Sequence, residues 1–270
     1  MKNLIKKISG IGLILFLALS ISAQDYKVKM GAGGKVVISK VNEVDIVGHN
    51  GTEVIVQGVS RKENEDERGN GLRVINGSGK DDNTGLGLSA IKDGNELTIE
   101  QISKNTEGRF TIKIPKGVSV LYEHNRHEGN DLNIKDISGE IEVTAHFNNV
   151  KLENVTGPMS INTIHGNVEA MFSSVNQKNP STIRTSHGFI DVTLPSSTKA
   201  DLKLRSAHGD MMTDFDINRN VKSVKTAEKK DNCGNCESHS NSRMTGTING
   251  GGVLIDLYTS HANIYLRKKK

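Results

Sequence analysis

The chain has 270 residues and a formal net charge of +4, with 34% apolar residues, 4% aromatic residues and no tryptophan. This length allows one large or two small domains. A nucleic-acid partner is excluded, because no basic stripe runs along the sequence and the single basic cluster, residues 267–270, reads as a solvated terminus.

The first 23 residues are expected to form a cleaved signal peptide. A basic start, an apolar run from Ile11 to Leu19 and the small pair Ser22 and Ala23 follow the plan of a secretory leader. No later stretch approaches the ~20 apolar residues of a transmembrane helix, so we do not expect an integral membrane protein. The leader holds three lysines and no acidic residue, so its removal lowers the charge from +4 to about +1. The mature chain is expected in the periplasm, at the cell surface or outside the cell.

Residues 24–115 read as an N-terminal β region. Short runs rich in Val and Ile alternate with Gly, Asn and Asp, which is typical of strands separated by turns. The charged, Gly- and Asn-rich stretch 62–87 is expected to be mainly a surface loop. A turn at 115–117 loosely separates this region from a repeat region, residues 116–270.

A small motif recurs in the repeat region as "TAHFN", "TIHGN", "TSHGF", "SAHGD" and "TSHAN". Its histidines are His146, His165, His187, His208 and His261. The first four are 19, 22 and 21 residues apart, and the last follows after 53 residues. Between the motifs, apolar residues recur at every second position. This pattern predicts two short strands in each unit of about 20 residues.

Two architectures are compatible with strands at this spacing. An antiparallel sandwich or barrel has turns every 8–12 residues but does not explain why similar residues recur in alternate turns. A parallel β-solenoid does explain the recurrence, because equivalent residues lie side by side at the strand spacing of ~4.8 Å. We therefore predict an all-β, parallel β-solenoid with coils of about 20 residues, preceded by the N-terminal strands.

Alternation of side chains also predicts where the motif lies. Apolar residues stand two positions before the Thr or Ser, which should place the hydroxyl and the histidine on the core-facing side near a corner. The predicted hydroxyl stack comprises Thr163, Thr185, Ser206 and Thr259. In the "TAHFN" copy the equivalent apolar position holds Glu142, so this copy departs from the pattern. Gly166, Gly188 and Gly209 follow directly, where we expect a positive backbone φ.

The sequence resembles the bacterial putative-adhesin family, exported domains of unknown function. The resemblance rests on the repeated "T-x-[polar]-G-[DN]-[IV]" turns, on "FTIKIPKGVSV" at residues 110–120 and on the late "GTINGGGVLIDLYTSHANIYL". It implies a parallel β-solenoid in an envelope protein and supplies no catalytic residues. The family usually has Ser or Asn where this chain has histidine, so the histidines are a departure.

An insertion is expected at about residues 218–244, where the repeat spacing breaks. It is polar and contains "CGNCESH", with Cys233, Cys236 and His239. Export favours a local disulfide between the two cysteines. A Cys and His metal site or redox chemistry are the alternatives, although redox chemistry requires a reactive thiolate.

Two interpretations of the histidine row remain open. Stacked neutral imidazoles can cap the turns, or neighbouring imidazoles can bind Zn²⁺ or Cu²⁺. In both cases neighbouring positive charges repel, so the fold is expected to loosen as the pH falls from about 7 to 5.

Catalysis is not expected. A polysaccharide enzyme needs converging carboxylates and aromatic platforms. The candidate carboxylates are Asp136, Asp191, Asp201, Asp210 and Asp256, each explained by a strand or turn position. We therefore predict a non-enzymatic exported cell-envelope protein, an adhesin or a structural scaffold, without a cofactor and with envelope or extracellular surface components as candidate partners. The alternative is a periplasmic metal-binding protein that uses the histidine row.

Overall fold

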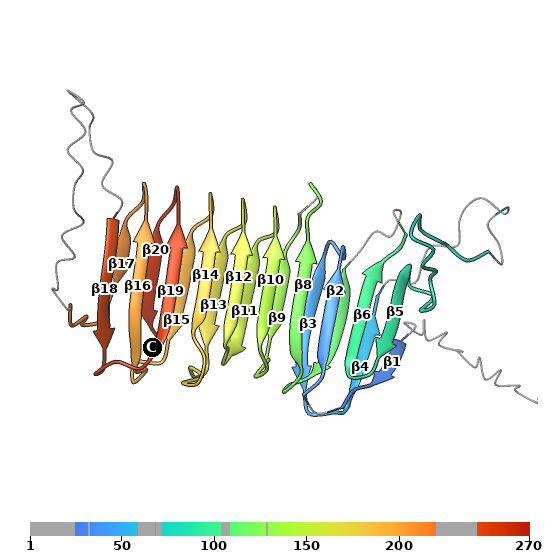
Figure 1. Ribbon diagram of the computed structural model, residues 1–270, viewed down its shortest axis with the longest axis horizontal. Helices are drawn as coiled ribbons and strands as arrows, with labels where there is room; N and C mark the ends of the chain where they lie inside the picture. The colour runs from blue at the N-terminus through green and yellow to red at the C-terminus, as the bar shows by residue number, and fades with distance from the viewer. Residues whose placement is uncertain are drawn as a thin grey trace, which may run out of the picture.

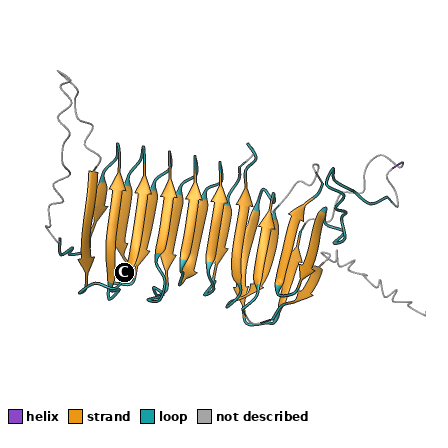
Figure 2. Cartoon of the chain, viewed as in Figure 1, coloured by secondary structure: helices purple, strands orange, loops and turns teal. Residues whose placement is uncertain are grey.

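The computed structural model describes residues 25–31, 33–58, 68, 72–103, 109–127, 129–219 and 242–270. The regular elements in those ranges are β-strands, which confirms the all-β prediction (Figure 2). The expected signal peptide and both cysteines lie outside the described residues. Within the described ranges, no helix is long and apolar enough to cross a membrane.

The strands form two sheets of ten strands each (Figure 1). Sheet A has the spatial order β1 (Asp25–Lys29), β4 (Glu53–Gln57), β7 (Phe110–Pro115), β3 (Val44–His49), β9 (Leu132–Lys135), β11 (Val150–Val155), β13 (Val168–Phe172), β15 (Ile190–Leu194), β20 (Ile264–Lys268) and β17 (Met211–Thr213). Sheet B has the order β18 (Ser242–Ile248), β16 (Ala200–Ser206), β19 (Val253–Thr259), β14 (Ser181–Thr185), β12 (Met159–Thr163), β10 (Ile141–Ala145), β8 (Ser119–His124), β2 (Lys35–Ser39), β6 (Glu96–Gln101) and β5 (Leu88–Asp93).

In the repeat region the chain alternates between the two sheets. Strands β8, β10, β12 and β14 are parallel neighbours in sheet B, and β9, β11, β13 and β15 are parallel neighbours in sheet A. Each unit therefore contributes one strand to each sheet and lies beside the unit before it. Paired positions are 18 residues apart between Ile141 and Met159, and 22 apart between Ser160 and Thr182. Two strands for each unit of about 20 residues is what the motif spacing predicted.

The last units do not follow one another in sequence order. Strands β19 and β20 lie between the β14–β15 unit and the β16–β17 unit, pairing in parallel with both. Strand β18 pairs antiparallel with β16 on the outer side, and it begins at Ser242, inside the expected insertion. Strands β16 and β17 are therefore not adjacent to β14 and β15, and the later strands β19 and β20 lie between them.

Antiparallel strands lie at both ends of the structure. Strands β1 and β4 extend sheet A beyond β7, and β5 lies beside β6 in sheet B. At the opposite end β18 is the outermost strand of sheet B. N-terminal strands therefore cover one end of the two sheets. The C-terminal strands β19 and β20 do not cover the other end, because they are internal strands.

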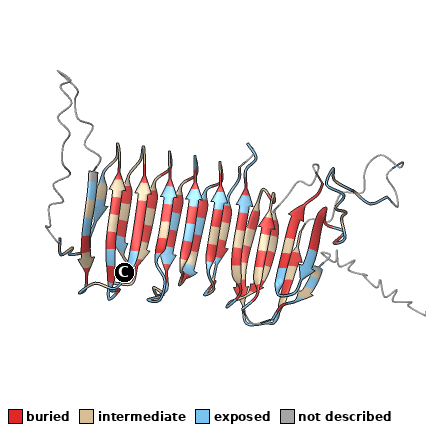
Figure 3. Ribbon diagram, in the orientation of Figure 1, coloured by how far each residue is buried: buried red, intermediate tan, exposed pale blue. Residues whose placement is uncertain are grey.

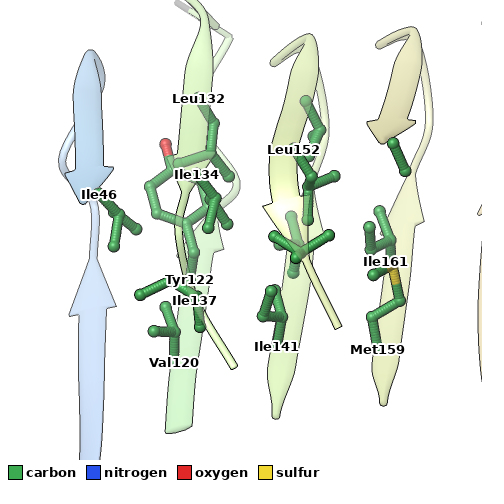
Figure 4. Packing of buried hydrophobic residues seen from close by; sticks show 14 of the residues in the cluster. Ile46, Val120, Tyr122, Leu132, Ile134, Ile137, Ile141, Leu152, Met159 and Ile161 are labelled. Atoms are coloured by element: carbon green, nitrogen blue, oxygen red, sulfur yellow. The ribbon is translucent and has the colours of Figure 1, made fainter. Parts of the chain in front are cut away.

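One hydrophobic core runs between the sheets (Figures 3 and 4). Side chains alternate between buried and exposed along the strands, as in β12 and β13. The buried positions hold mainly Val, Ile and Leu, whose branched side chains suit a pleated surface. Burying each such side chain stabilises the fold by about 1.5–3 kcal/mol. Strands from both sides of the boundary expected near residue 115 contribute to this core, because β3 pairs with β9 and β2 with β8.

Candidate functional site

The motif hydroxyls form a buried row at the end of sheet B, hereafter the hydroxyl row. Its members, in spatial order, are Thr163, Thr185, Thr259 and Ser206, with 0–2% of their surface exposed. Thr185 Oγ1 donates a hydrogen bond to the Gly166 carbonyl of the neighbouring unit at 3.0 Å and accepts one from the Gly188 amide at 3.2 Å. The Thr185 hydroxyl thus joins two units, and the buried, in-register row confirms the predicted hydroxyl stack near a corner.

Thr259 and Ser206 also donate hydrogen bonds to a neighbouring unit. Thr259 donates to the Gly188 carbonyl at 2.9 Å, and Ser206 donates to the Ala262 carbonyl at 3.0 Å. The Gly209 amide donates in turn to Ser206 at 2.8 Å. A buried polar group without a partner is costly, so these paired bonds keep the hydroxyls compatible with the core.

The glycines of the motif serve close approach between units. A Cβ on Gly188 would overlap the carbonyl oxygen of Gly166, and one on Gly166 would overlap that of Asn148. The expected positive φ is wrong, because Gly166, Gly188 and Gly209 are not among the residues with positive φ. Ala262 occupies the same position in its own turn. Glycine is therefore required for close approach in particular turns and not in every turn.

Four motif histidines stack on one another beyond the hydroxyl row. We call the series Phe147, His165, His187, His261 and His208 the ring row. The ring centroids of Phe147 and His165 are 4.9 Å apart, those of His165 and His187 4.6 Å, those of His187 and His261 4.7 Å, and those of His261 and His208 5.1 Å. Neighbouring ring planes are 1–23° apart, so the rings are stacked face to face.

The ring row faces solvent, which corrects the expectation that the histidines share the core-facing side. His165, His187, His208 and His261 are all exposed. The strand ends at the preceding Thr or Ser, and strict alternation of faces does not continue through the turn. The His261 Nδ1–H donates to the Ser186 carbonyl at 3.1 Å, so this ring also contacts the neighbouring turn.

His146 is not a member of the ring row. Ala145 pairs with Thr163, so Phe147 is the equivalent of His165, and His146 is one position too early. In the "TAHFN" copy, the structural equivalent of the motif histidine is therefore Phe147, one position after His146. The His146 ring is edge-on to Phe147, with centroids 6.5 Å apart and planes 70° apart. The parity conflict at Glu142 was the signal that could have revealed this shift.

Two further histidines near the first turn were missed from the sequence. The His127 ring lies 5.5 Å from the Phe147 ring, at the N-terminal end of the ring row. His124 is buried and pairs in register with Ala145, so it occupies the position that Thr163 has two strands away. Neither His124 nor His127 belongs to a recognisable copy of the motif, so the sequence alone does not place them beside the motif residues.

Asn148 replaces the motif glycine in the first turn and has a different set of contacts. Its Nδ2 donates to the Asn130 carbonyl at 2.7 Å and to the Tyr122 hydroxyl at 3.3 Å. The Tyr122 hydroxyl donates to the Val41 carbonyl at 2.7 Å. Burial raises the pKa of Tyr122 well above its ordinary value, so the phenol remains neutral and acts as a structural donor.

Metal binding by the histidines has to be judged from ring orientation. The nitrogen lone pairs lie in the ring planes, so two rings stacked face to face do not both point at an ion between them. Among the residues that the structure describes, no group of three or more His, Cys, Asp or Glu side chains is arranged to hold a metal ion. Cys233 and Cys236 lie outside that part of the chain.

The candidate carboxylates contact different partners in different parts of the two sheets. Asp191 pairs with Arg267 at 2.9 Å, and Asp136 accepts a hydrogen bond from Asn154. Asp201 accepts from the Gly252 amide at 3.3 Å. Asp256 is buried among basic side chains of sheet B. These contacts are those of structural ion pairs and turn hydrogen bonds.

No family model and no curated protein matches the sequence. Two solved structures are similar at low sequence identity. A putative cell adhesion protein from Clostridium sporogenes has a TM-score of 0.43 and 12% identity, covering 91% of this chain and 99% of that chain. A putative adhesin from Bacteroides fragilis has a TM-score of 0.28 and 10% identity, covering 91% of this chain and 96% of that chain.

Proposed function

We propose that this chain is a non-enzymatic exported protein of the cell envelope that presents a rigid parallel β-solenoid surface, as an adhesin or a structural scaffold. The observation that carries the proposal is one core enclosed by two sheets whose repeat units lie side by side. In a solenoid each unit is one coil, and stability comes from contacts between neighbouring coils. The surface is then long and regular.

The turn contacts support a rigid surface rather than a hinged one. Hydrogen bonds of the hydroxyl row connect each unit to the next, and the ring row repeats this connection on the solvent side. Asparagine side chains add further links; for example, the Asn167 backbone amide donates to Asn149 Oδ1 at 3.1 Å. Such a surface positions many ligand contacts at fixed separations, which is what an adhesin or scaffold requires.

Retention on surfaces tests the proposed function. Beads coated with the purified mature chain should be retained on envelope material or cell surfaces of the organisms that the producing bacterium meets. Beads coated with heat-unfolded chain serve as the control. Equal retention of the two bead types would contradict presentation by the folded surface. Release of sugars from envelope glycans by the purified chain would contradict a non-enzymatic role.

The ring row separates the scaffold from the metal-binding alternative. Because its rings stack face to face, we propose that they stabilise the turns and that the protein needs no cofactor. Titration of the parent chain with Zn²⁺ and Cu²⁺ by calorimetry should give no tight binding. The triple variant His165→Ser, His187→Ser, His208→Ser should give the same result as the parent. Tight binding that this variant abolishes would support the metal-binding protein instead.

A further inference from the structure

A cluster of basic residues lies on the outer face of sheet B at its β18 end. We call Arg184, Lys203, Arg205 and Arg243 the basic cluster. Arg184 is on β14, Lys203 and Arg205 are on β16, and Arg243 is on β18. Strand register places Arg205 beside Arg243 on one side and beside Tyr258 on the other, and Tyr258 lies beside Arg184.

One buried carboxylate organises the basic cluster. Asp256 is 5% exposed and lies 3.3 Å from Lys203 Nζ, 3.2 Å from Arg205 Nη2 and 3.9 Å from Arg184 Nη2. A single negative charge cannot neutralise three positive charges, so the cluster retains an excess of positive charge. Among the described residues on the outer faces of these strands, Asp201 is the other acidic residue, and its carboxylate accepts from the Gly252 amide.

The excess of positive charge on the outer face of sheet B is local to its β18 end. Further along the same face, the outward positions of β12 hold Ser160 and Asn162, and those of β10 and β8 include Glu142 and Glu123. On the outward positions of β14, β19, β16 and β18, the four members of the basic cluster stand against Asp201 and Asp256. The positive face is therefore a distinct region of the surface rather than a consequence of overall charge.

An aromatic ring lies within the basic cluster. The Arg205 guanidinium is 5.1 Å from the centroid of the Tyr258 ring, and the Tyr258 hydroxyl is hydrogen-bonded to Ser260 at 3.0 Å. Arginine can bind a carboxylate or a sulfate through two parallel hydrogen bonds. The guanidinium lies over the Tyr258 ring, so this contact positions Arg205. A row of such cations on neighbouring strands suits a chain of acidic groups better than a single free anion.

We propose that the basic cluster binds an acidic polysaccharide, a chain of uronate or sulfated sugars lying across strands β14, β19, β16 and β18. Neighbouring strands are about 4.8 Å apart, so the cluster extends about 14 Å and can contact several consecutive acidic groups. The inference rests on the proposed function, because it names the ligand class that the presented surface recognises. Carboxylate and sulfate groups share the recognition chemistry, and the experiment separates them.

Binding of the mature chain to immobilised polysaccharides tests the proposal. The probes are alginate as a polyuronate, heparin as a sulfated chain and dextran as a neutral chain. Binding to at least one acidic chain should be saturable and weaken with salt, and dextran should not bind. The variant Arg184→Gln, Lys203→Gln, Arg243→Gln should bind roughly tenfold or more weakly, since three charge-assisted contacts are lost.

The matched control places the same three charge changes on sheet A. The variant Lys113→Gln, Lys135→Gln, Lys151→Gln should bind like the parent chain, and circular dichroism should show both variants folded. Equal losses in the two variants would overturn the proposal, because binding would then depend on net charge alone. Binding of duplex DNA as tight as that of the acidic chains would also overturn it.

A surface assay distinguishes this inference from the proposed function. If beads coated with the basic-cluster variant are retained on cells as well as the parent, the acidic-polysaccharide site is wrong while the adhesive scaffold stands. If the parent binds alginate or heparin but is not retained on any envelope surface, the proposed function fails and the site remains.

Discussion

The two ends of the chain reach the same fold by different contacts. In the repeat region, parallel units are connected by rows of equivalent side chains, such as the hydroxyl row. In the N-terminal part, antiparallel strands lie at the edges of the sheets, and ion pairs join individual side chains near the parallel strands. Arg109 binds Glu43 and Asp45 at 2.6 Å, and Glu100 binds Lys40 and Lys80 at 2.5 Å.

This difference shows where a sequence repeat comes from. A residue type recurs when its side chain contacts its own equivalent in the next unit, as it does in the ring row. The N-terminal strands have no such equivalent neighbour, so each of their contacts joins a unique pair. We therefore expect substitutions at stacked positions of the repeat region to lower the free energy of unfolding most. In the N-terminal part, changes of charge should have the strongest effect on it.

The largest effect is expected from Gly188→Val in the repeat region. The new side chain would collide with the Gly166 backbone, which cannot move without separating two units. Overpacking of this kind costs about 1–3 kcal/mol or more. Chemical denaturation followed by circular dichroism measures the loss. Gly117→Ala, in a turn with open space around the glycine, is the control and should be nearly neutral.

A smaller effect is expected from Thr185→Val in the hydroxyl row. The substitution preserves shape but leaves the Gly166 carbonyl and the Gly188 amide without their side-chain partner. We expect a loss of about 1–3 kcal/mol in the free energy of unfolding. Thr182→Val, on the outer face of the same strand, should change it much less. Equal effects of the two variants would contradict a structural role of the hydroxyl.

In the N-terminal part the corresponding test is Glu100→Gln. Burial acts to raise the pKa of the Glu100 carboxyl, but hydrogen bonds and charges from Lys40 and Lys80 outweigh burial, so the pKa is below its ordinary value. A carboxyl with a lowered folded-state pKa stabilises the protein above the unfolded-state pKa, and this contribution is lost as the pH falls through the folded value.

The parent should therefore lose stability below about pH 4.5 more steeply than Glu100→Gln. At neutral pH the variant should be about 1 kcal/mol less stable, because two charge-assisted hydrogen bonds are weakened rather than lost. Unfolding curves at several pH values check both statements. Glu96→Gln, at the exposed start of the same strand, is the control. Parallel acid profiles for parent and Glu100→Gln would contradict the role given to this ion pair.

The smallest effect is expected in the ring row. His187→Ser removes an exposed ring, so at pH 7 we expect a loss of about 0.5 kcal/mol. Chemical denaturation at pH 7 measures this loss. A loss as large as that of Thr185→Val would contradict the lower weight given to the exposed ring row.

Several features were accessible from the sequence because each depends on local periodicity. Apolar residues at every second position predicted the strands and the core, and motif spacing predicted two strands for each unit. The hydroxyl row followed from the same parity. The histidines of the ring row were predicted as a series, but their exposure to solvent was not, because alternation of faces ends where the turn begins.

Other features depended on contacts between distant residues. Nothing in the spacing revealed that the unit with His261 lies between those with His187 and His208, since a separation of 53 residues fits either order. Phe147 was overlooked because the "TAHFN" copy matches the motif best when aligned one residue out. The basic cluster was invisible, because its members come from three strands that are separated in sequence.

Cysteine cross-linking tests the stacking of units most directly. In a chain with both native cysteines replaced by Ser, Asp191→Cys with Tyr265→Cys places the thiols on paired positions of neighbouring strands. Asp191→Cys with Met212→Cys places them two strands apart, at about 9.6 Å, beyond the about 7 Å between Cα atoms that a disulfide can bridge. Mild oxidation should cross-link the first pair and leave the second reduced. Efficient cross-linking of the second pair would show that the units follow sequence order and would contradict the account.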